Sequence, residues 1–282
     1  MKVGIIGCGA MGLAMAGHIV KRGGDEVVAH DVDPEHLKSA AGVGAKPVAA
    51  LDELGPQAEM LIVMVATDAQ VRDVVAGVAP HCRPGTLVAV ASTVHPATMR
   101  DLAEPIAAAG MKLIDAPVVF GLLGAKEGTL VSLCGGADAD VAEARETLLA
   151  YSKAVHHVGP LGHGQLAKTV NNMLHWAACV ANYEALLLAK RHGMDAQALR
   201  EVLLVCPAEN GTLRHWDRTR FTWPEKDMDT ALELAQEGGL TLPLFGQVDQ
   251  LVKLIKPEHV KGLLYGESAP YLGREVRPMP AP

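Results

Sequence analysis

Short apolar runs alternate with amphipathic stretches through the first half of the chain. The runs that predict strands are residues 2–7, 26–31, 59–65, 86–92, 111–117 and 129–135. Between them, apolar residues recur at helical spacing, which predicts helices over 11–21, 68–78, 96–109 and 138–150. The run EMLIVMV (59–65) is apolar throughout, as is typical of a parallel strand covered on both faces. Alternating strands and helices predict an α/β fold with a Rossmann-type doubly wound sheet.

The pattern changes near Gly159, where the strand signal ends. From Gln165 to Arg191 the helical spacing holds for about 27 residues, which predicts a helix of roughly 40 Å that bridges two domains or lies in a subunit interface. Further helices are predicted over 194–204, 226–239 and 242–255. We therefore expect an NAD-binding Rossmann-type domain at 1–162 and an all-helical (all-α) substrate and oligomerisation domain at 163–282, joined by the long helix. The tail from Gly266 is expected to be extended or loosely ordered.

Composition narrows the classes of function. The formal net charge of −7 argues against a nucleic-acid binder, which needs a basic face. No apolar run reaches the roughly 18 residues that span a bilayer, and the chain starts with a strand pattern rather than a signal peptide. The five cysteines are scattered without a CxxC pair, so we expect a reduced, cytoplasmic protein. His156 and His157 are neighbours in an expected strand and point to opposite faces, so we expect no metal.

The hexamer GCGAMG, which begins at Gly7, fits the pattern GxGxxG. It follows an expected strand and opens an expected helix, the context in which such a loop binds a dinucleotide. Gly7 would permit the tight turn, Gly9 the approach of the pyrophosphate and Gly12 the close packing of helix on strand. With Ala10 and Met11, which begin the helix, they are our expected cofactor-binding loop. The alternative is a glycine turn without a ligand.

Asp31 ends the second expected strand, close to the offset of about 20 residues after Gly12 at which a carboxylate binds the adenosine ribose. A carboxylate there repels a 2′-phosphate, and no arginine follows before Pro34, so we predict NAD in preference to NADP. The alternative role is an N-cap, because Asp31 or Asp33 can cap the helix that Pro34 begins. We assign Asp31 to the ribose and Asp33 to the cap.

Two further strand ends should lie at the same edge of the sheet. Val65 and Ala66 lie at the carboxyl end of one apolar strand, and Ser92 and Thr93 lie at the end of the next. Ligands of such sheets bind at the carboxyl ends of the strands, so we expect Val65, Ala66 and Thr93 to contact the cofactor. The alternative is that Ser92 or Thr93 only satisfies the loop backbone.

Lys168 and Asn172 lie four residues apart on one face of the long helix, shortly after Gly162 and Gly164. Burial and the positive end of the helix dipole both disfavour an ammonium, so a lysine there is a candidate to take or give a proton. Asn172 is a candidate to orient a substrate hydroxyl. A solvated surface lysine is the alternative, and the residues alone leave both interpretations open.

Several motifs together resemble the β-hydroxyacid dehydrogenase family, which includes 3-hydroxyisobutyrate and tartronate-semialdehyde dehydrogenases. The matching segments are IIGCGAMGLAMA (5–16), ASTVHPATMRDLA (91–103), DAPV (115–118), GAKEGTL (124–130), GHGQLAKTVNN (162–172) and EKDMDTALELA (225–235). They occur in the family's order and are spread over about the first 245 residues, so together they are far more specific than the glycine loop alone.

The resemblance implies NAD(P)-dependent oxidation of a hydroxyl β to a carboxylate, in a homodimer or homotetramer. Lys168 would be the catalytic lysine, and Asn172 would bind the substrate. Thr93 would lie beside the nicotinamide and the substrate. Lys226 would reach the cofactor from the helical domain, while Asp227 would support the wall of the site.

One segment departs from the family. Members of the family usually continue DAPVSGG, and that serine–glycine–glycine turn offers a hydroxyl and N–H groups to the substrate carboxylate. This chain has Val119, Phe120 and Gly121 there. We assign all three to the substrate site and expect a larger or more apolar substrate than 3-hydroxyisobutyrate. The alternative is local repacking with unchanged chemistry.

The stretch 207–225 is rich in arginine and aromatic residues. An arginine at 214, 218 or 220 can hold a carboxylate bidentately, and the aromatic side chains can cover an apolar substrate. The aromatic candidates are Trp216, Phe221 and Trp223. The alternative for the stretch is a dimer contact or a solvated basic loop.

Three functions follow from these residues. The leading hypothesis is an NAD-dependent oxidoreductase that interconverts a 3-hydroxy acid and its 3-oxo acid or semialdehyde. An imine reductase or reductive aminase has the same architecture; Lys168 argues against it, and the apolar pair Val119 and Phe120 argues for it. A protein that binds NAD without turnover is the third hypothesis, and the presence of Lys168, Asn172 and Lys226 argues against it.

Overall fold

The computed structural model describes residues 1–280 and divides the chain into two compact units. The first is Met1–Lys168, and the second begins at Thr169. The division falls inside α8 (His163–Arg191), a helix of 29 residues that agrees with the predicted long helix. The sequence-based boundary at residue 162 lies just ahead of this helix. The first turns of α8 group with the first unit because their backbone is hydrogen-bonded to Asp115 of the sheet.

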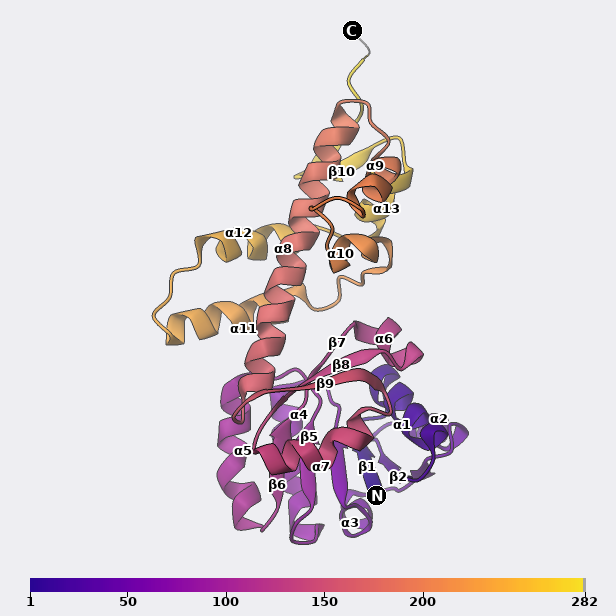
Figure 1. Cartoon of the computed structure of the whole chain (residues 1–282), viewed down its shortest axis with the longest axis vertical. Coiled ribbons are helices and arrows are strands. Elements are labelled where there is room, and N and C mark those ends of the chain that lie inside the picture. The colour runs from indigo at the N-terminus through magenta and orange to yellow at the C-terminus, as the bar shows by residue number, and fades with distance from the viewer. Residues whose placement is uncertain (281–282) are drawn as a thin grey trace. The chain divides into compact units, whose positions relative to one another are not determined.

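The first unit is built on one sheet (Figure 1). Its strands are β1 (Lys2–Ile6), β2 (Glu26–His30), β3 (Lys46–Pro47), β4 (Met60–Val63), β5 (Leu87–Val90), β6 (Lys112–Asp115), β7 (Val118–Val119), β8 (Leu130–Gly135) and β9 (Ser152–Gly159). They follow the order β3-β2-β1-β4-β5-β6-β8-β7, and β9 pairs with β8. The pairs from β3 to β6 are all parallel. The strand order reverses between β1 and β4, which is where ligands bind in open sheets of this kind.

Helices cover both faces of this sheet. They are α1 (Ala10–Arg22), α2 (Pro34–Gly42), α3 (Leu51–Leu54), α4 (Asp68–Val78), α5 (Pro96–Ala108), α6 (Gly121–Glu127) and α7 (Asp138–Leu148), with 3-10 turns η1 (Gly55–Gln57) and η2 (Ala79–His81). One buried apolar cluster joins the sheet to α1 and α7, and the other joins it to α4 and α5. The apolar strands are therefore buried from both sides, as their composition predicts.

The predicted series of parallel strands is wrong at β8. This strand runs antiparallel to β6 and β7, although it is parallel to β9. Only the short helix α6 separates β7 from β8 along the chain, and a parallel crossover needs a dozen or more residues. The segment therefore turns back on itself, and its end of the sheet is mixed.

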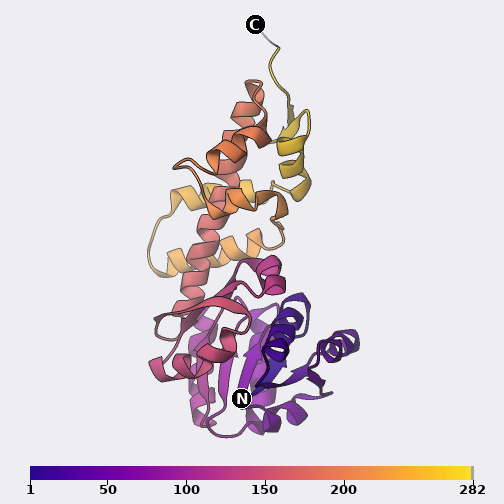
Figure 2. The same cartoon turned by 45° about the vertical axis from the view of Figure 1, so that its right-hand side comes forward.

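The second unit is helical apart from one hairpin. Its elements after α8 are α9 (Ala196–Leu203), α10 (Gly211–Arg214), η3 (Trp216–Arg218), α11 (Pro224–Glu237), α12 (Pro243–Val252), α13 (Pro257–Tyr265), β10 (Ala269–Tyr271) and β11 (Arg274–Val276). The hairpin packs beside α13 (Figure 2), so this part of the tail is extended, one of the two expected alternatives, and it is paired in a sheet. Buried Ala269 and the hydroxyl of Tyr183, which donates to the Pro270 carbonyl at 2.5 Å, fix it in place.

The predicted fold class is confirmed: a mostly parallel Rossmann-type sheet is followed by a helical unit. Within residues 1–280, the structure has no helix that combines the length and the apolar character required to cross a membrane.

Candidate active site

The glycine loop between β1 and α1 has the geometry that its sequence predicts. Gly7 has φ of +93°, and a Cβ there would collide with the carbonyl oxygen of Met64. A Cβ on Gly12 would collide with the carbonyl oxygen of Gly7, so this position needs glycine for close packing of α1. At Gly9 a Cβ would meet nothing within 4 Å. Gly9 thus leaves open space in front of the helix.

The start of α1 is suited to an anion. No side chain caps the helix at Gly9, and Ala10 and Met11 form its exposed to half-buried first turn. The first N–H groups of a helix have no partner within the helix and carry its positive dipole end, so they bind phosphate readily. The open space at Gly9 and the uncapped turn therefore fit the pyrophosphate of a dinucleotide.

Asp31 lies beside this loop at the end of β2. Its carboxylate accepts the Cys8 N–H at 2.6 Å and the Asp33 N–H at 2.8 Å, and His36 Nδ1 lies 3.2 Å away. Burial is the largest single influence and raises the pKa of Asp31, but the two N–H groups and His36 together lower the pKa below its ordinary value. The helix α2 is capped by Asp33, which accepts the Glu35 N–H at 2.9 Å. The carboxylate of Asp31 is thus not used as a helix cap.

The ends of β4 and β5 are tied together by Ser92. Its Oγ accepts a hydrogen bond from the Val65 N–H at 2.8 Å. Ser92 thus satisfies a backbone N–H group, which is the alternative role that the sequence suggested for it. The Ala66 N–H donates to the Gln70 side chain at 2.9 Å, within a capping box at the start of α4. Thr93 is half-buried in the loop that follows β5. Val65, Ala66 and Thr93 therefore lie at the same sheet edge as the glycine loop.

Lys168 and Asn172 lie one turn apart on α8, as predicted. Lys168 is half-buried and Asn172 is 8% exposed. Asn171 is exposed and donates from Nδ2 to Asn172 Oδ1 at 3.1 Å. Gly162 and Gln165, at and just after the start of the helix, donate their N–H groups to the buried Asp115 at 2.7 Å each.

The turn that departs from the family keeps a backbone of glycine type. Phe120 has φ of +81° and Gly121 has φ of +55°, a left-handed region that favours glycine. Val119 is buried, whereas the Phe120 side chain is 54% exposed. Only Phe120 of this apolar pair therefore presents its side chain to the surroundings.

In the second unit, two of the side chains considered as substrate contacts have partners within the unit. Trp216 is fully buried against Tyr183, so it is part of the core and does not cover a substrate. Arg214 pairs with Glu209 at the surface. Sequence analysis missed Arg200, which is buried and donates to two backbone carbonyls and to Asp217 at 2.9 Å. A buried arginine on a helix carries no sequence signal of its own.

Lys226 and Asp227 lie in the first turn of α11, and both are half-buried. The Asp227 carboxylate accepts the indole N–H of Trp176, on α8, at 2.9 Å. Asp227 thus holds α11 against α8 within the second unit.

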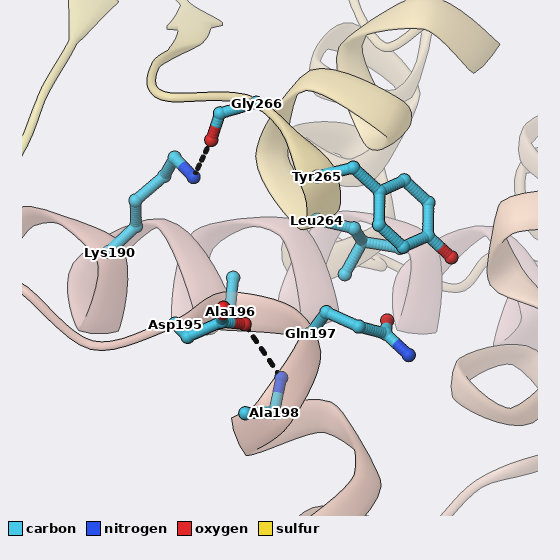
Figure 3. Close-up of a pocket in the computed structure, with 8 residues that line it drawn as sticks. All are labelled: Lys190, Asp195, Ala196, Gln197, Ala198, Leu264, Tyr265 and Gly266. Atoms are coloured by element: carbon cyan, nitrogen blue, oxygen red, sulfur yellow. Dashed lines mark hydrogen bonds between the residues drawn. The ribbon is translucent and has the colours of Figure 1, made fainter.

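A separate hollow of about 460 Å³ lies in the second unit (Figure 3). It is bordered by Lys190 on α8, by the start of α9 and by Tyr265 at the end of α13. Lys190 is buried and donates to the carbonyls of Leu263 at 3.1 Å and Gly266 at 2.5 Å. Its ammonium therefore caps the carboxyl end of α13, a structural role.

Comparisons with known proteins agree with this arrangement. A family model described as the NAD binding domain of 6-phosphogluconate dehydrogenase matches residues 2–159. A model described as NAD-binding of NADP-dependent 3-hydroxyisobutyrate dehydrogenase matches residues 162–263. The two models together cover both units of the fold.

Individual relatives point the same way. The probable mitochondrial 3-hydroxyisobutyrate dehydrogenase of Dictyostelium discoideum is 33% identical over 200 residues, which are 70% of this chain but only 62% of that protein. The 2-(hydroxymethyl)glutarate dehydrogenase of Eubacterium barkeri is 27% identical over 265 residues, 89% of this chain and 88% of that protein. The solved 3-hydroxyisobutyrate dehydrogenase of Mycobacterium tuberculosis, with L-serine, has a TM-score of 0.83 and 27% identity, covering 90% of this chain and 92% of that one.

The Dictyostelium relative is thus matched over less than two thirds of its own length, while the two family models and the fold extend over most of this chain. The glycine loop, the sheet order and the long helix are all accounted for by one family. This chain belongs to the β-hydroxyacid dehydrogenase family.

Proposed function

We propose that the protein is an NAD-dependent oxidoreductase that interconverts a 3-hydroxy acid and its 3-oxo acid or semialdehyde. Family membership supports an NAD(P)-dependent enzyme that acts on CH–OH groups. The observation that carries the proposal is the position of Lys168 and Asn172, one turn apart near the start of a helix anchored to the sheet. Lys168 is half-buried, which favours a role in proton transfer over that of a solvated surface lysine.

Each residue then has a defined task in the proposed reaction. In oxidation, the carbinol carbon loses hydride and the substrate hydroxyl loses its proton to the neutral Nζ of Lys168. In reduction, the same ammonium returns the proton to the carbonyl oxygen. Asn172 orients the hydroxyl, and Thr93 lies beside the reacting carbon. A bound nicotinamide supplies the hydride acceptor or donor, and the glycine loop would hold its pyrophosphate.

Preference for NAD over NADP rests on Asp31. Its carboxylate accepts hydrogen bonds from the backbone N–H groups of Cys8 and Asp33, which orient it at the end of β2. The pKa of the Asp31 carboxyl lies below its ordinary value, so the group is negatively charged at neutral pH. A 2′-phosphate placed near it would be repelled. Lys226 is proposed as a further contact to the cofactor, on the basis of family resemblance.

The proposed substrate is larger or more apolar than 3-hydroxyisobutyrate. The exposed ring of Phe120 supports this proposal, because it occupies the turn that offers a glycine and a neighbouring serine in the family. Val119 and Gly121 remain proposed members of the substrate site. The name of the Eubacterium relative, a 2-(hydroxymethyl)glutarate dehydrogenase, refers to a 3-hydroxy acid with a longer side arm.

The protein is proposed to work as a homodimer or homotetramer, in line with the sequence-based expectation. The long helix α8 carries exposed apolar side chains at Val170, Leu174 and Leu188, and Leu174 is 61% exposed. Apolar side chains repeated on one helix are typical of an interaction surface. Light scattering tests this expectation directly, and a monomeric mass at micromolar concentration contradicts it. The cytoplasmic location stays a prediction.

The deciding experiment follows NADH formation with a panel of 3-hydroxy acids, from small polar to aryl-substituted ones. Lys168→Ala is assayed beside the wild type, and Lys38→Ala, an exposed lysine on α2, is the control. We expect the Lys168 variant to lose about 10²–10⁴-fold in kcat, the usual contribution of a proton-transferring group, and the control to lose nothing. Absence of turnover across the panel contradicts the proposal. The same proteins would then be assayed in the reductive direction with amines, for the imine reductase alternative.

A further inference from the structure

Gln165 is a buried polar residue that the proposed reaction does not use. Its side chain is fully buried in the first turn of α8. The amide nitrogen Nε2 donates to the Ser92 carbonyl at 2.8 Å, and Oε1 accepts the Val94 N–H at 3.0 Å. One partner can only accept and the other can only donate, so these two bonds also fix which way round the amide lies.

The two backbone groups that Gln165 binds lie on either side of Thr93. Thr93 is therefore the middle residue of a loop clamped at both of its neighbours. Ser92 also accepts the Val65 N–H through its Oγ at 2.8 Å, so the clamp continues to the end of β4. The position of Thr93 is thus set by a network that extends from α8 to two strand ends.

The other end of the link is the anchored start of α8. The Gln165 N–H donates to Asp115 Oδ2, and the Gly162 N–H donates to Asp115 Oδ1, both at 2.7 Å. Asp115 is fully buried at the end of β6, and an anion is favourable at a helix N-terminus. Burial is the largest influence and raises the pKa of Asp115, although the N–H groups act in the opposite direction. The helix therefore cannot slide along the sheet without breaking these bonds.

Lys168 follows Gln165 by three residues on the same helix and shares its face. We infer that Gln165 is a positioning residue, which joins the Thr93 loop to the first turn of α8 and so fixes Thr93 relative to Lys168. The inference rests on the proposed function, because that function gives Thr93 and Lys168 their roles. Proton transfer and hydride transfer both depend on sub-ångström placement, so a loosened link lowers the rate without removing a reacting group.

The test compares Gln165→Met with Ser132→Ala in the full-length protein. Gln165→Met keeps the length of the side chain and removes both hydrogen bonds. Ser132→Ala removes a different buried hydrogen bond of the same sheet, the 2.8 Å bond between the hydroxyls of Ser132 and Ser152. With the best substrate of the panel, we expect Gln165→Met to lose about 10–100-fold in kcat, because a misplacement of about 1 Å can cost about 100-fold, with KM and NADH affinity changed less than about threefold. Ser132→Ala should keep its kcat.

A second readout does not depend on turnover. Amide hydrogen exchange of residues 92–98 and 162–168 should accelerate at least about tenfold in Gln165→Met and stay unchanged in Ser132→Ala. If the wild type oxidises no 3-hydroxy acid, the proposed function fails, and the exchange rates still decide the inference. Unchanged exchange in Gln165→Met overturns it, as does a kcat within twofold of the wild type in an active enzyme.

Gln165→Glu is the rescue variant, and it carries the test if Gln165→Met does not fold. A protonated glutamic acid offers the same donor and acceptor as the amide, whereas the ionised form faces the Ser92 carbonyl with a negative oxygen. Burial and the nearby Asp115 both favour the protonated form. The kcat of Gln165→Glu divided by that of the wild type should therefore rise as the pH falls. The exchange of residues 92–98 in Gln165→Glu, divided by that of the wild type at the same pH, should fall over the same range. Ratios of kcat and of exchange that do not change with pH contradict the inference.

Discussion

The ammonium of Lys153, on β9, lies 4.2 Å from the centroid of the Phe120 ring. Phe120 has a left-handed backbone with φ of +81°, which costs a non-glycine residue roughly 1–2 kcal/mol. The cation–π contact with Lys153 offsets about 0.5–1 kcal/mol of this backbone strain, the usual value at an exposed site. The turn after β7 thus keeps a glycine-like shape while it presents an aromatic ring, which places the departure from the family in a side chain rather than in the backbone.

Replacing Phe120→Gly should change substrate preference and leave the fold intact. Relief of the left-handed strain offsets the lost cation–π contact and the larger chain entropy of glycine, so the free energy of unfolding should change by less than about 1 kcal/mol. Without the ring, kcat/KM for small polar 3-hydroxy acids should rise about tenfold or more relative to aryl-substituted ones. Steady-state kinetics over the panel measure this ratio.

Lys153→Gln is the matched control, because it removes the cation and keeps the ring. Its substrate preference should stay within about threefold of the wild type, since Phe120 is still present. A substrate profile of Phe120→Gly that equals the wild-type profile would favour local repacking with unchanged chemistry.

Two alanine substitutions in the glycine loop should separate folding from cofactor binding. A Cβ at position 9 meets no atom within 4 Å. The free energy of unfolding of Gly9→Ala should therefore lie within about 0.5 kcal/mol of the wild-type value. Its methyl group points into the space assigned to the pyrophosphate, so NADH affinity should fall at least about tenfold.

Gly12→Ala, in contrast, should lose both stability and NADH affinity, because its Cβ collides with the carbonyl of Gly7. We expect a loss of about 1–3 kcal/mol, as is usual for overpacking. Urea unfolding and fluorescence titration with NADH measure the two effects. Equal NADH affinity of Gly9→Ala and the wild type would be incompatible with the proposed binding loop.

Asp31→Asn should weaken discrimination against NADP, because it removes the charge that we propose to face the 2′-phosphate. The ratio of kcat/KM for NAD to that for NADP should fall about tenfold or more, the effect of a mispaired charge. Kinetics with each cofactor at saturating substrate give the ratio. A variant that keeps the wild-type ratio would show that Asp31 does not select the cofactor.

The same carboxylate should contribute to acid sensitivity. Its pKa is lower in the folded protein than the ordinary value of 3.8, so its stabilising contribution is present above that pH and is lost as the pH falls below it. The difference in free energy of unfolding between wild type and Asp31→Asn should therefore shrink below about pH 3.8. Urea titrations at a series of pH values measure it, and a difference that grows on acidification would contradict the sign.

Arg200→Met should destabilise the second unit by about 3–5 kcal/mol, because it leaves buried carbonyls and Asp217 without their partner. Arg214→Ala, which breaks the exposed pair with Glu209, should cost less than about 1 kcal/mol. Chemical unfolding followed by tryptophan fluorescence compares them, since Trp216 lies in this core. Similar losses in both variants would contradict the structural role of Arg200.

Much of the first unit was predictable from local sequence. The helix at 68–78 agrees with α4 at both ends, because a threonine N-cap marks its start and the apolar spacing continues to its end. The strands β1, β2, β4, β5 and β6 lie within their predicted runs, because the buried middle of each parallel strand is apolar. The glycine loop could be predicted because it is a contiguous motif. Asp31 could be predicted because it lies at a fixed spacing after that motif.

The direction of β8, the hairpin β10–β11 and the helix α13 were not predicted. They depend on which edge of a sheet or face of a helix is available to a segment, and periodicity does not encode this. Likewise, Val119 and Phe120 are two neighbouring apolar residues in the sequence. Only the turn geometry shows that the Val119 side chain is buried and the Phe120 side chain is exposed.

The sequence by itself determined the fold class, the family and the identities of the candidate reacting residues, because these follow from spacing along the chain. The tertiary structure decided how those residues are held. Gln165 binds the backbone on both sides of Thr93, Asp115 anchors the start of α8, and Arg200 organises the segment before α11. These contacts join residues far apart in the chain, so their hydrogen bonds exist only once the sheet and the helices have brought them together.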